Sequence, residues 1–133
     1  MIYLDTNIFL LPLFGTDKAS RVCLSLLQDL SEEKLSAGTS TLTWDEFLYT
    51  LQNHWGIEKA LELSQNFLIT PNLVFFPATE EIINKAQILV KEKGLKPRDA
   101  IHAATAIHNS IKEIASDDAD FDKIKELKRI KIR

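Results

Sequence analysis

Acidic residues stand at four separated places along this 133-residue chain, and their side chains would suit a metal ion. They are Asp5 in IYLDTN, Glu46 in TLTWDEF, Asp99 in KPRDAIHAA, and the pair Asp118 and Asp120 in ASDDADF. Carboxylate oxygens without clustered cysteine or histidine are ligands that favour Mg²⁺ or Mn²⁺ over zinc. Such ions can activate water and neutralise phosphate charge in the hydrolysis of a phosphodiester. That chemistry is open to the chain if its fold brings the acids together.

Each acid also has a purely structural interpretation. Asp5 could cap the helix that follows it. Thr43-Trp44-Asp45-Glu46 matches a capping box, in which Glu46 would bond back to the start of its helix. Asp99 lies in a first helical turn, where the helix dipole favours a carboxylate. The last acids are harder to explain, because four carboxylates within six residues repel one another unless a cation lies among them: Asp117, Asp118, Asp120 and Asp122.

The elements around these acids predict how they could meet. Apolar strands at 2–4 and 113–115 stop at or just before acids. Further strands are expected at 34–39, 73–76 and 129–132. Helices are expected from Ile8 to Gly15 with an interruption at Pro12, over 17–30 with Asp17 as its N-cap, through Leu51 in a segment that Gly56 ends, and over 57–68. Two more are expected, one capped by Thr79 and stopped by Gly94 and one from Pro97 onward, with a helical turn or two over 121–127. This alternation predicts a three-layer α/β/α fold with a mostly parallel sheet of four or five strands. The carboxyl ends of parallel strands meet at one edge, which would gather the acids.

Length and composition are those of one globular domain covering residues 1–133. A hydrophobic share of 45% and a charged share of 26% exclude a disordered or fibrous chain. The single cysteine, Cys23, lies among apolar helix positions and is expected to be a buried structural thiol. No signal peptide or membrane-spanning run is visible, so a cytoplasmic protein without a membrane partner is expected.

The net charge of −3 argues at first against a nucleic-acid partner. The positive charges are unevenly spread, however. Residues 123–133 hold six basic side chains against one acid, and residues 85–98 hold five against one. Either run could equally be the solvated face of a helix or strand. Local basic surfaces are therefore compatible with the acidic total.

Taken together, the four blocks resemble the PIN-domain nucleases, and most closely their small toxin members of the VapC type. The resemblance rests on residues 2–7 (IYLDTN), on Glu46 early in its helix, on residues 97–104 (PRDAIHAA) and on residues 116–122 (SDDADFD). The blocks occur in the family's order and cover nearly the whole chain. The resemblance implies a PIN-like fold and a metal-dependent endoribonuclease.

The resemblance also implies roles for individual residues. Asp5, Glu46, Asp99 and Asp118 would form the catalytic quartet, and the metal would be held by Asp5, Asp99, Asp118 and Asp120. The doubled aspartate leaves open whether Asp117 or Asp118 is the ligand. Asn7 and Ser116 would orient the carboxylates, Lys96 and Arg98 would hold RNA, and His102 would be a structural residue of the packed helix. A cognate antitoxin and a homodimer are the implied protein partners.

Two other functions fit parts of the sequence. A non-catalytic PIN-like interaction module would be expected to lose an acid, whereas all four are present. A phosphoryl-transfer enzyme could use Asp5 as nucleophile, but no second acid lies two residues after it. The aromatic residues of the third helix and its end could stack on bases, form a dimer interface or pack in the core, the last being the default: Trp44, Phe47, Tyr49 and Trp55.

Overall fold

A five-stranded, all-parallel sheet forms the centre of the computed structural model, which describes residues 1–133. The strand order is β3-β2-β1-β4-β5, so the direction of winding reverses beside β1. This confirms the predicted α/β/α class with a parallel sheet. The strands are β1 (Ile2–Leu4), β2 (Ala37–Ser40), β3 (Leu73–Phe76), β4 (Glu113–Ala115) and β5 (Lys128–Ile130).

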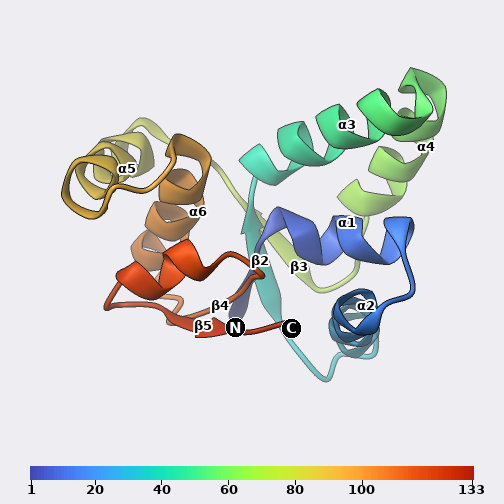
Figure 1. Cartoon of the computed structure of the whole chain (residues 1–133), viewed down its shortest axis with the longest axis horizontal. Helices are drawn as coiled ribbons and strands as arrows, with labels where there is room; N and C mark the ends of the chain where they lie inside the picture. The colour runs from blue at the N-terminus through green and yellow to red at the C-terminus, as the bar shows by residue number, and fades with distance from the viewer.

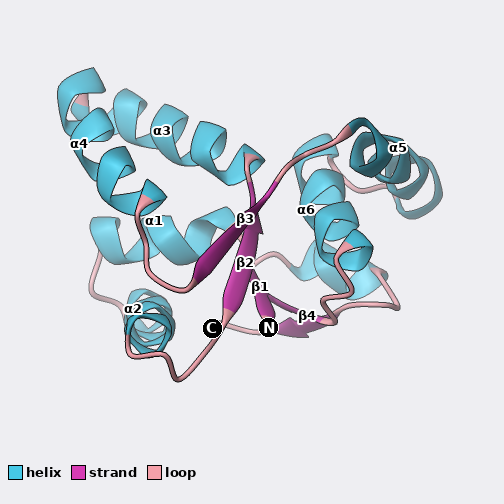
Figure 2. Cartoon of the chain, turned by 180° about the vertical axis from the view of Figure 1, so that it is seen from behind, coloured by secondary structure: helices cyan, strands magenta, loops and turns pink.

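Helices cover both faces of the sheet (Figure 1). Four helices lie on one face and two on the other, and the reverse view shows the same division (Figure 2). No helix is both long and apolar enough to cross a bilayer. The first group is α1 (Thr6–Phe14), α2 (Lys18–Ser31), α3 (Leu42–Trp55) and α4 (Ile57–Leu68), and the second is α5 (Glu80–Lys93) and α6 (Pro97–His108).

The central strand β1 is apolar because both of its faces are covered. Successive side chains of a strand point to opposite faces. Ile2 and Leu4 therefore pack among α1–α4, whereas Tyr3 packs on the side of α5 and α6. The fully buried Cys23 of α2 belongs to the first core, as predicted. This packing fixes β1, and with it the position of Asp5 at its end.

Helix starts and stops follow local chemistry where the sequence predicts it. The Asp17 side chain accepts a hydrogen bond from the Ser20 amide at the start of α2. The Thr79 hydroxyl accepts one from the Ile82 amide at the start of α5. Gly94 ends α5 in the left-handed conformation, with φ 66°. These three predictions are confirmed.

Several predicted boundaries are wrong. Helix α1 is not interrupted at Pro12, because its buried residues hold it against the sheet despite one missing amide donor. Helix α3 runs on from Leu51 to Trp55 and ends at Gly56, the residue expected to end this segment, whose φ is 83°. Strands β2 and β5 are shifted from their expected ranges by up to three residues. The turns expected at 121–127 are a 3₁₀ helix, η1 (Ala119–Lys123).

Gly38 on β2 leaves room for the half-buried Phe76 ring of β3. A Cβ built at Gly38 would lie 2.4 Å from Cε2 of Phe76. We expect Gly38→Ala to lower the free energy of unfolding by about 1–3 kcal/mol, measured by urea denaturation. Gly15→Ala is the matched control, because its Cβ would come no closer than 3.4 Å to a neighbouring atom. Equal stabilities of the two variants would contradict this packing.

Candidate metal centre at the sheet edge

Asp5 lies at the carboxyl end of β1 and is held from two sides. Its Oδ1 accepts a hydrogen bond from the Thr6 amide at 2.8 Å, so the predicted capping interaction is present. Its Oδ2 accepts one from the Ser116 hydroxyl at 2.7 Å. Ser116 directly follows β4, the neighbour of β1 in the sheet. The two strand ends are thereby joined through the Asp5 carboxylate, which is 7% exposed.

Three further acids gather beside this point. Asp99, in the first turn of α6, lies next to Asp118 and Asp120 of the turn after β4. One carboxylate oxygen from each of the three lies within 4.8 Å of the others. Asp118 is fixed by its backbone amide, which donates to the Ser116 hydroxyl at 3.0 Å, and by its Oδ1, which accepts from the Asp120 amide at 2.8 Å. Ser116 therefore helps to position both Asp5 and Asp118.

Asp120 pairs with Lys123 at 3.2 Å, whereas Asp99 and Asp118 have no basic partner in the structure. The pKa of Asp99 is raised to about 7, first by burial and then by the charge of Asp118, a hydrogen bond with Asp118 and the charge of Asp5. His102 opposes this rise only partly. A divalent cation would reverse the balance, since it favours the charged form of each neighbouring carboxyl. An all-oxygen donor set of this kind fits Mg²⁺ or Mn²⁺.

Glu46 is turned toward the same site and does not close a capping box. Helix α3 begins at Leu42, so Thr43 lies inside it and its hydroxyl pairs with that of Thr39 at 2.6 Å. The Oε1 atom of Glu46 instead accepts from the Thr6 hydroxyl at 2.9 Å and bonds to Nε2 of His102 at 2.5 Å. The capping-box interpretation is therefore wrong.

The protonation state of Glu46 follows from its partners. Burial raises the pKa of Glu46, but the hydrogen bond and charge of His102, the bond from Thr6 and the charge of Arg98 outweigh it. The net pKa of Glu46 is lowered. For His102 the effects have the opposite signs. Burial lowers its pKa, but the bond to Glu46 and the charges of Asp5, Glu46 and Asp99 raise it by more, so the pKa of His102 is raised. Glu46 is therefore a carboxylate.

Sequence reasoning missed how far His102 takes part in the site. Its ring is 1% exposed, as a structural histidine should be, yet both nitrogens make hydrogen bonds. Nδ1 lies 2.6 Å from the Tyr3 hydroxyl, which accepts from the Ser40 amide at 3.0 Å. Tyr3 and Thr6 were missed as well. A large polar ring among alanines on the buried face of α6, three residues after Asp99, was the available signal, because buried polar groups need partners.

The neighbouring aspartates, Asp117 and Asp122, form ion pairs with arginines. Asp117 accepts from Nε of Arg133 at 2.7 Å. Asp122 accepts two hydrogen bonds from Arg129, each of 2.9 Å, and Arg129 also donates to the Ser116 carbonyl at 3.2 Å. These two acids therefore lie outside the three-acid cluster. Of the four aspartates between residues 117 and 122, Asp118 and Asp120 are the two that lie beside Asp99.

The remaining candidates lie around the site or away from it. Asn7 is exposed and makes no hydrogen bond to any acid of the site; Thr6 makes such contacts instead. Lys96 and Arg98 are exposed and line an open hollow together with Glu46, Pro97, Asp99 and Asp118. Of the four aromatic residues of α3, only Phe47 is in the core, so the default interpretation is wrong for Trp44, Tyr49 and Trp55.

Residues 2–127 match the model of the PIN domain. The chain belongs to the PIN-domain family. Its sequence has no significant match among curated proteins.

Solved structures share this PIN fold at low sequence identity. A chain of the VapBC2 complex of Rickettsia felis, a structure with a promoter DNA fragment, is 20% identical with a TM-score of 0.74, and the match covers 98% of each chain. The VapC20 toxin of Mycobacterium tuberculosis, which cleaves the sarcin-ricin loop, is 19% identical with a TM-score of 0.72, covering 92% of this chain and 93% of that one. FitAcB of Neisseria gonorrhoeae is 21% identical with a TM-score of 0.72, covering 99% and 98%.

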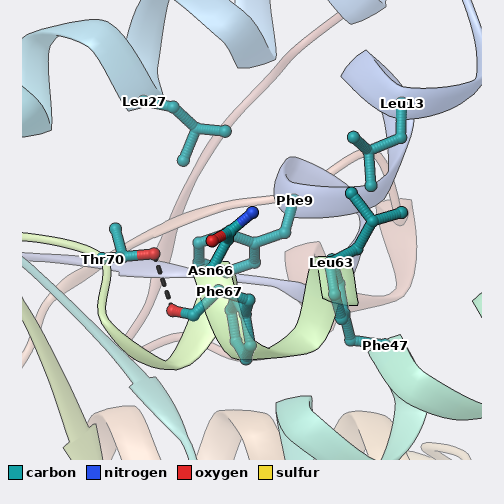
Figure 3. A pocket seen from close by; sticks show the side chains of 8 residues that line it. All are labelled: Phe9, Leu13, Leu27, Phe47, Leu63, Asn66, Phe67 and Thr70. Atoms are coloured by element: carbon teal, nitrogen blue, oxygen red, sulfur yellow. Dashed lines mark hydrogen bonds between the residues drawn. The ribbon is translucent and has the colours of Figure 1, made fainter. Parts of the chain in front are cut away.

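The PIN domain also has an apolar hollow that contains none of the acids. It opens among α1, α2, α3 and α4 (Figure 3). The Thr70 hydroxyl at its margin donates to the Phe67 carbonyl at 2.7 Å. The lining side chains are Phe9, Leu13, Leu27, Phe47, Leu63, Asn66, Phe67 and Thr70.

The raised pKa of Asp99 predicts a pH-dependent loss of stability. Asp99 binds its proton more tightly in the folded than in the unfolded state, so its ionisation destabilises the fold. This destabilisation is absent below about pH 4 and complete above about pH 7. In EDTA, Asp99→Asn should raise the melting temperature by a few degrees at pH 8 and leave it unchanged at pH 4. Glu113→Gln, an exposed acid of β4, serves as the control. An equal gain at both pH values would contradict the assignment.

Proposed function

We propose that this PIN domain is a metal-dependent endoribonuclease, the toxin of a type II toxin–antitoxin pair. The observation that carries the proposal is the cluster of Asp99, Asp118 and Asp120 beside Asp5 at the carboxyl edge of the sheet. The raised pKa of Asp99 supports it, because burial and the neighbouring acids disfavour the charged form that a divalent cation would favour. The fold shared with the VapC20 toxin, which cleaves RNA of the sarcin-ricin loop, supports RNA as the substrate class.

Asp5, Asp99, Asp118 and Asp120 would hold the metal. When bound, Mg²⁺ or Mn²⁺ would supply an activated water and would neutralise charge on the phosphate and the leaving oxygen. The chain fixes two of these side chains before any ligand arrives: Asp5 through the Ser116 hydroxyl and the Thr6 amide, and Asp118 through the Asp120 amide. Such preorganisation avoids the cost of ordering the side chains during the reaction.

Glu46 is suited to accept a proton at this edge. It is a carboxylate, and its Oε1 is engaged by Thr6 and His102 while Oε2 makes no hydrogen bond. Because Glu46 lines the open hollow, Oε2 can take a proton from a water that attacks the phosphate. Glu46 is therefore proposed as the general base rather than as a metal ligand.

Neither rival function is favoured by the geometry. Both oxygens of Asp5 accept hydrogen bonds, so Asp5 is poorly placed to be a free nucleophile for phosphoryl transfer. A non-catalytic module would have no need to confine uncompensated acids at one edge, since clustered carboxylates oppose folding. A hydrolytic metal site would account both for the fixed orientation of Asp5 and for the clustering of the acids.

The proposed protein partners are an antitoxin and a second copy of the chain. VapBC2 of Rickettsia felis and a toxin–antitoxin complex of Klebsiella pneumoniae share the fold. The apolar hollow of α1–α4 offers an antitoxin a surface on the helices that carry Thr6 and Glu46. Exposed apolar side chains of α5 offer a surface for a homodimer: Ile83, Ile88 and Val90. With RNA as substrate, the cytoplasm is the proposed place of action.

The two members of the doubled aspartate provide the test of this function. Wild-type protein should cleave a structured RNA in Mn²⁺ and gain thermal stability from Mn²⁺. Asp118→Asn should remove the thermal shift and lower cleavage by about 100-fold or more, whereas Asp117→Asn should preserve both within about threefold. The Asp117 variant is the matched control, because its carboxylate pairs with Arg133 outside the cluster. Loss of both properties in Asp117→Asn, with Asp118→Asn unaffected, would contradict the proposed site.

The basic rim predicts how RNA binding depends on salt. Lys96 and Arg98 are exposed beside the acids, where they can contact phosphates that flank the cleaved bond. In the double variant Lys96→Gln/Arg98→Gln, the slope of log K against log salt should fall by about 0.7 for each charge removed. Binding of a labelled RNA, measured by fluorescence anisotropy, reports this slope.

Lys59→Gln is the control, since α4 covers the other face of the sheet from α6. An unchanged slope in the double variant would place the RNA elsewhere on the surface.

A further inference from the structure

We propose that His102 is a positioning residue, which fixes the Glu46 carboxylate through a chain of hydrogen bonds from the backbone of β2. The proposal rests on the proposed function in one respect, namely that Glu46 faces the reacting phosphate. Its geometric part concerns the resting protein and stands without any substrate.

The chain crosses four elements. The Ser40 amide of β2 donates to the Tyr3 hydroxyl of β1 at 3.0 Å, and that hydroxyl lies 2.6 Å from Nδ1 of His102 on α6. On the other side of the ring, Nε2 lies 2.5 Å from Oε1 of Glu46 on α3. A carboxylate offers only acceptors, so Nε2 must carry a hydrogen and donate it.

Glu46 needs such a restraint because its side chain is long. A free glutamate has several rotamers, and ordering it costs up to about 2 kcal/mol. His102 and the Thr6 hydroxyl converge on the same oxygen, Oε1, from different elements. Two donors to one oxygen fix both the place and the rotation of the carboxylate, which leaves Oε2 directed away from both of them.

The same contacts tie Glu46 to the acids of the cluster. His102 lies one helical turn after Asp99 on α6, so a shift of this helix moves both residues together. Thr6 follows Asp5 directly and gives its amide to Asp5 and its hydroxyl to Glu46. The position of Glu46 relative to Asp5 and Asp99 is thereby set by rigid elements rather than by its own helix alone.

Packing alone does not explain the ring. His102 is 1% exposed among alanines, and an apolar side chain of similar size would fill that space without needing partners. Yet no buried side-chain nitrogen or oxygen in the chain is left without a partner. The polar ring is matched on both sides, and one of its partners is Glu46 of the site.

The test compares three variants of the full chain by single-turnover and steady-state cleavage of RNA in saturating Mn²⁺. His102→Leu removes the hydrogen bonds of both ring nitrogens and should lower kcat by about 10- to 100-fold, with KM changed by less than about threefold. His102→Gln can place an amide donor near the position of Nε2 and should recover most of that loss. Thr105→Val, another buried polar residue of α6 that bonds only within its helix, should match wild type.

Equal kcat in His102→Leu and Thr105→Val would overturn the proposal, as would a loss confined to KM. Circular dichroism shows whether each variant is folded. The rescue by His102→Gln separates positioning from packing, because a residue that only fills space would not be replaced by an amide.

A second measurement does not depend on activity. Long-range ¹H–¹⁵N spectra of the wild-type protein report which ring nitrogen carries a hydrogen. We expect a protonated Nε2 whose ¹⁵N shift moves in Glu46→Gln and stays in Thr105→Val. A bare Nε2, or a shift that ignores Glu46→Gln, would overturn the proposal even if the protein cleaves RNA. If the wild-type protein cleaves no RNA, the proposed function fails, and the spectra still decide the hydrogen-bond chain.

Discussion

The candidate site depends on two hydrogen bonds of the Ser116 hydroxyl. The hydroxyl donates to Asp5 at the end of β1 and accepts from the Asp118 amide in the turn after β4. These two strands are neighbours at the point where the winding of the sheet reverses, which is the usual place for function in open parallel sheets. One buried hydroxyl therefore joins the acid of the first strand to the acidic turn of the fourth.

Electrostatics explains why these acids are held by hydrogen bonds and why a cation would stabilise them. Two carboxylates about 4–5 Å apart repel by about 3–4 kcal/mol at an effective dielectric constant near 20, whereas one hydrogen bond to a charged group contributes about 1.5–3 kcal/mol. The bonds from Ser116 and the backbone amides orient the acids but do not offset their mutual repulsion. The repulsion that remains contributes to the raised pKa of Asp99. The flanking acids Asp117 and Asp122 are instead paired with Arg133 and Arg129.

Local chemistry made much of the fold and part of the site predictable from the sequence. The strand that ends at Asp5, the caps at Asp17 and Thr79 and the parallel α/β class all follow from neighbouring residues. The partners of Glu46 do not, because Thr6 and His102 lie 40 and 56 residues away along the chain. The capping-box spacing was misleading, since the start of α3 is set by the end of β2 and lies before Thr43. Pairing of Asp117 with the terminal Arg133 also depended on tertiary structure.

Crystals soaked in Mn²⁺ show whether the fold assembles one metal site from acids of separate elements. Anomalous scattering locates the ion without reference to any activity. We expect a single strong peak contacted by Asp99 and Asp118, with Asp5 and Asp120 beside it. A peak on Asp117 or Asp122, or none at this edge in crystals where Mn²⁺ binds elsewhere, would contradict it.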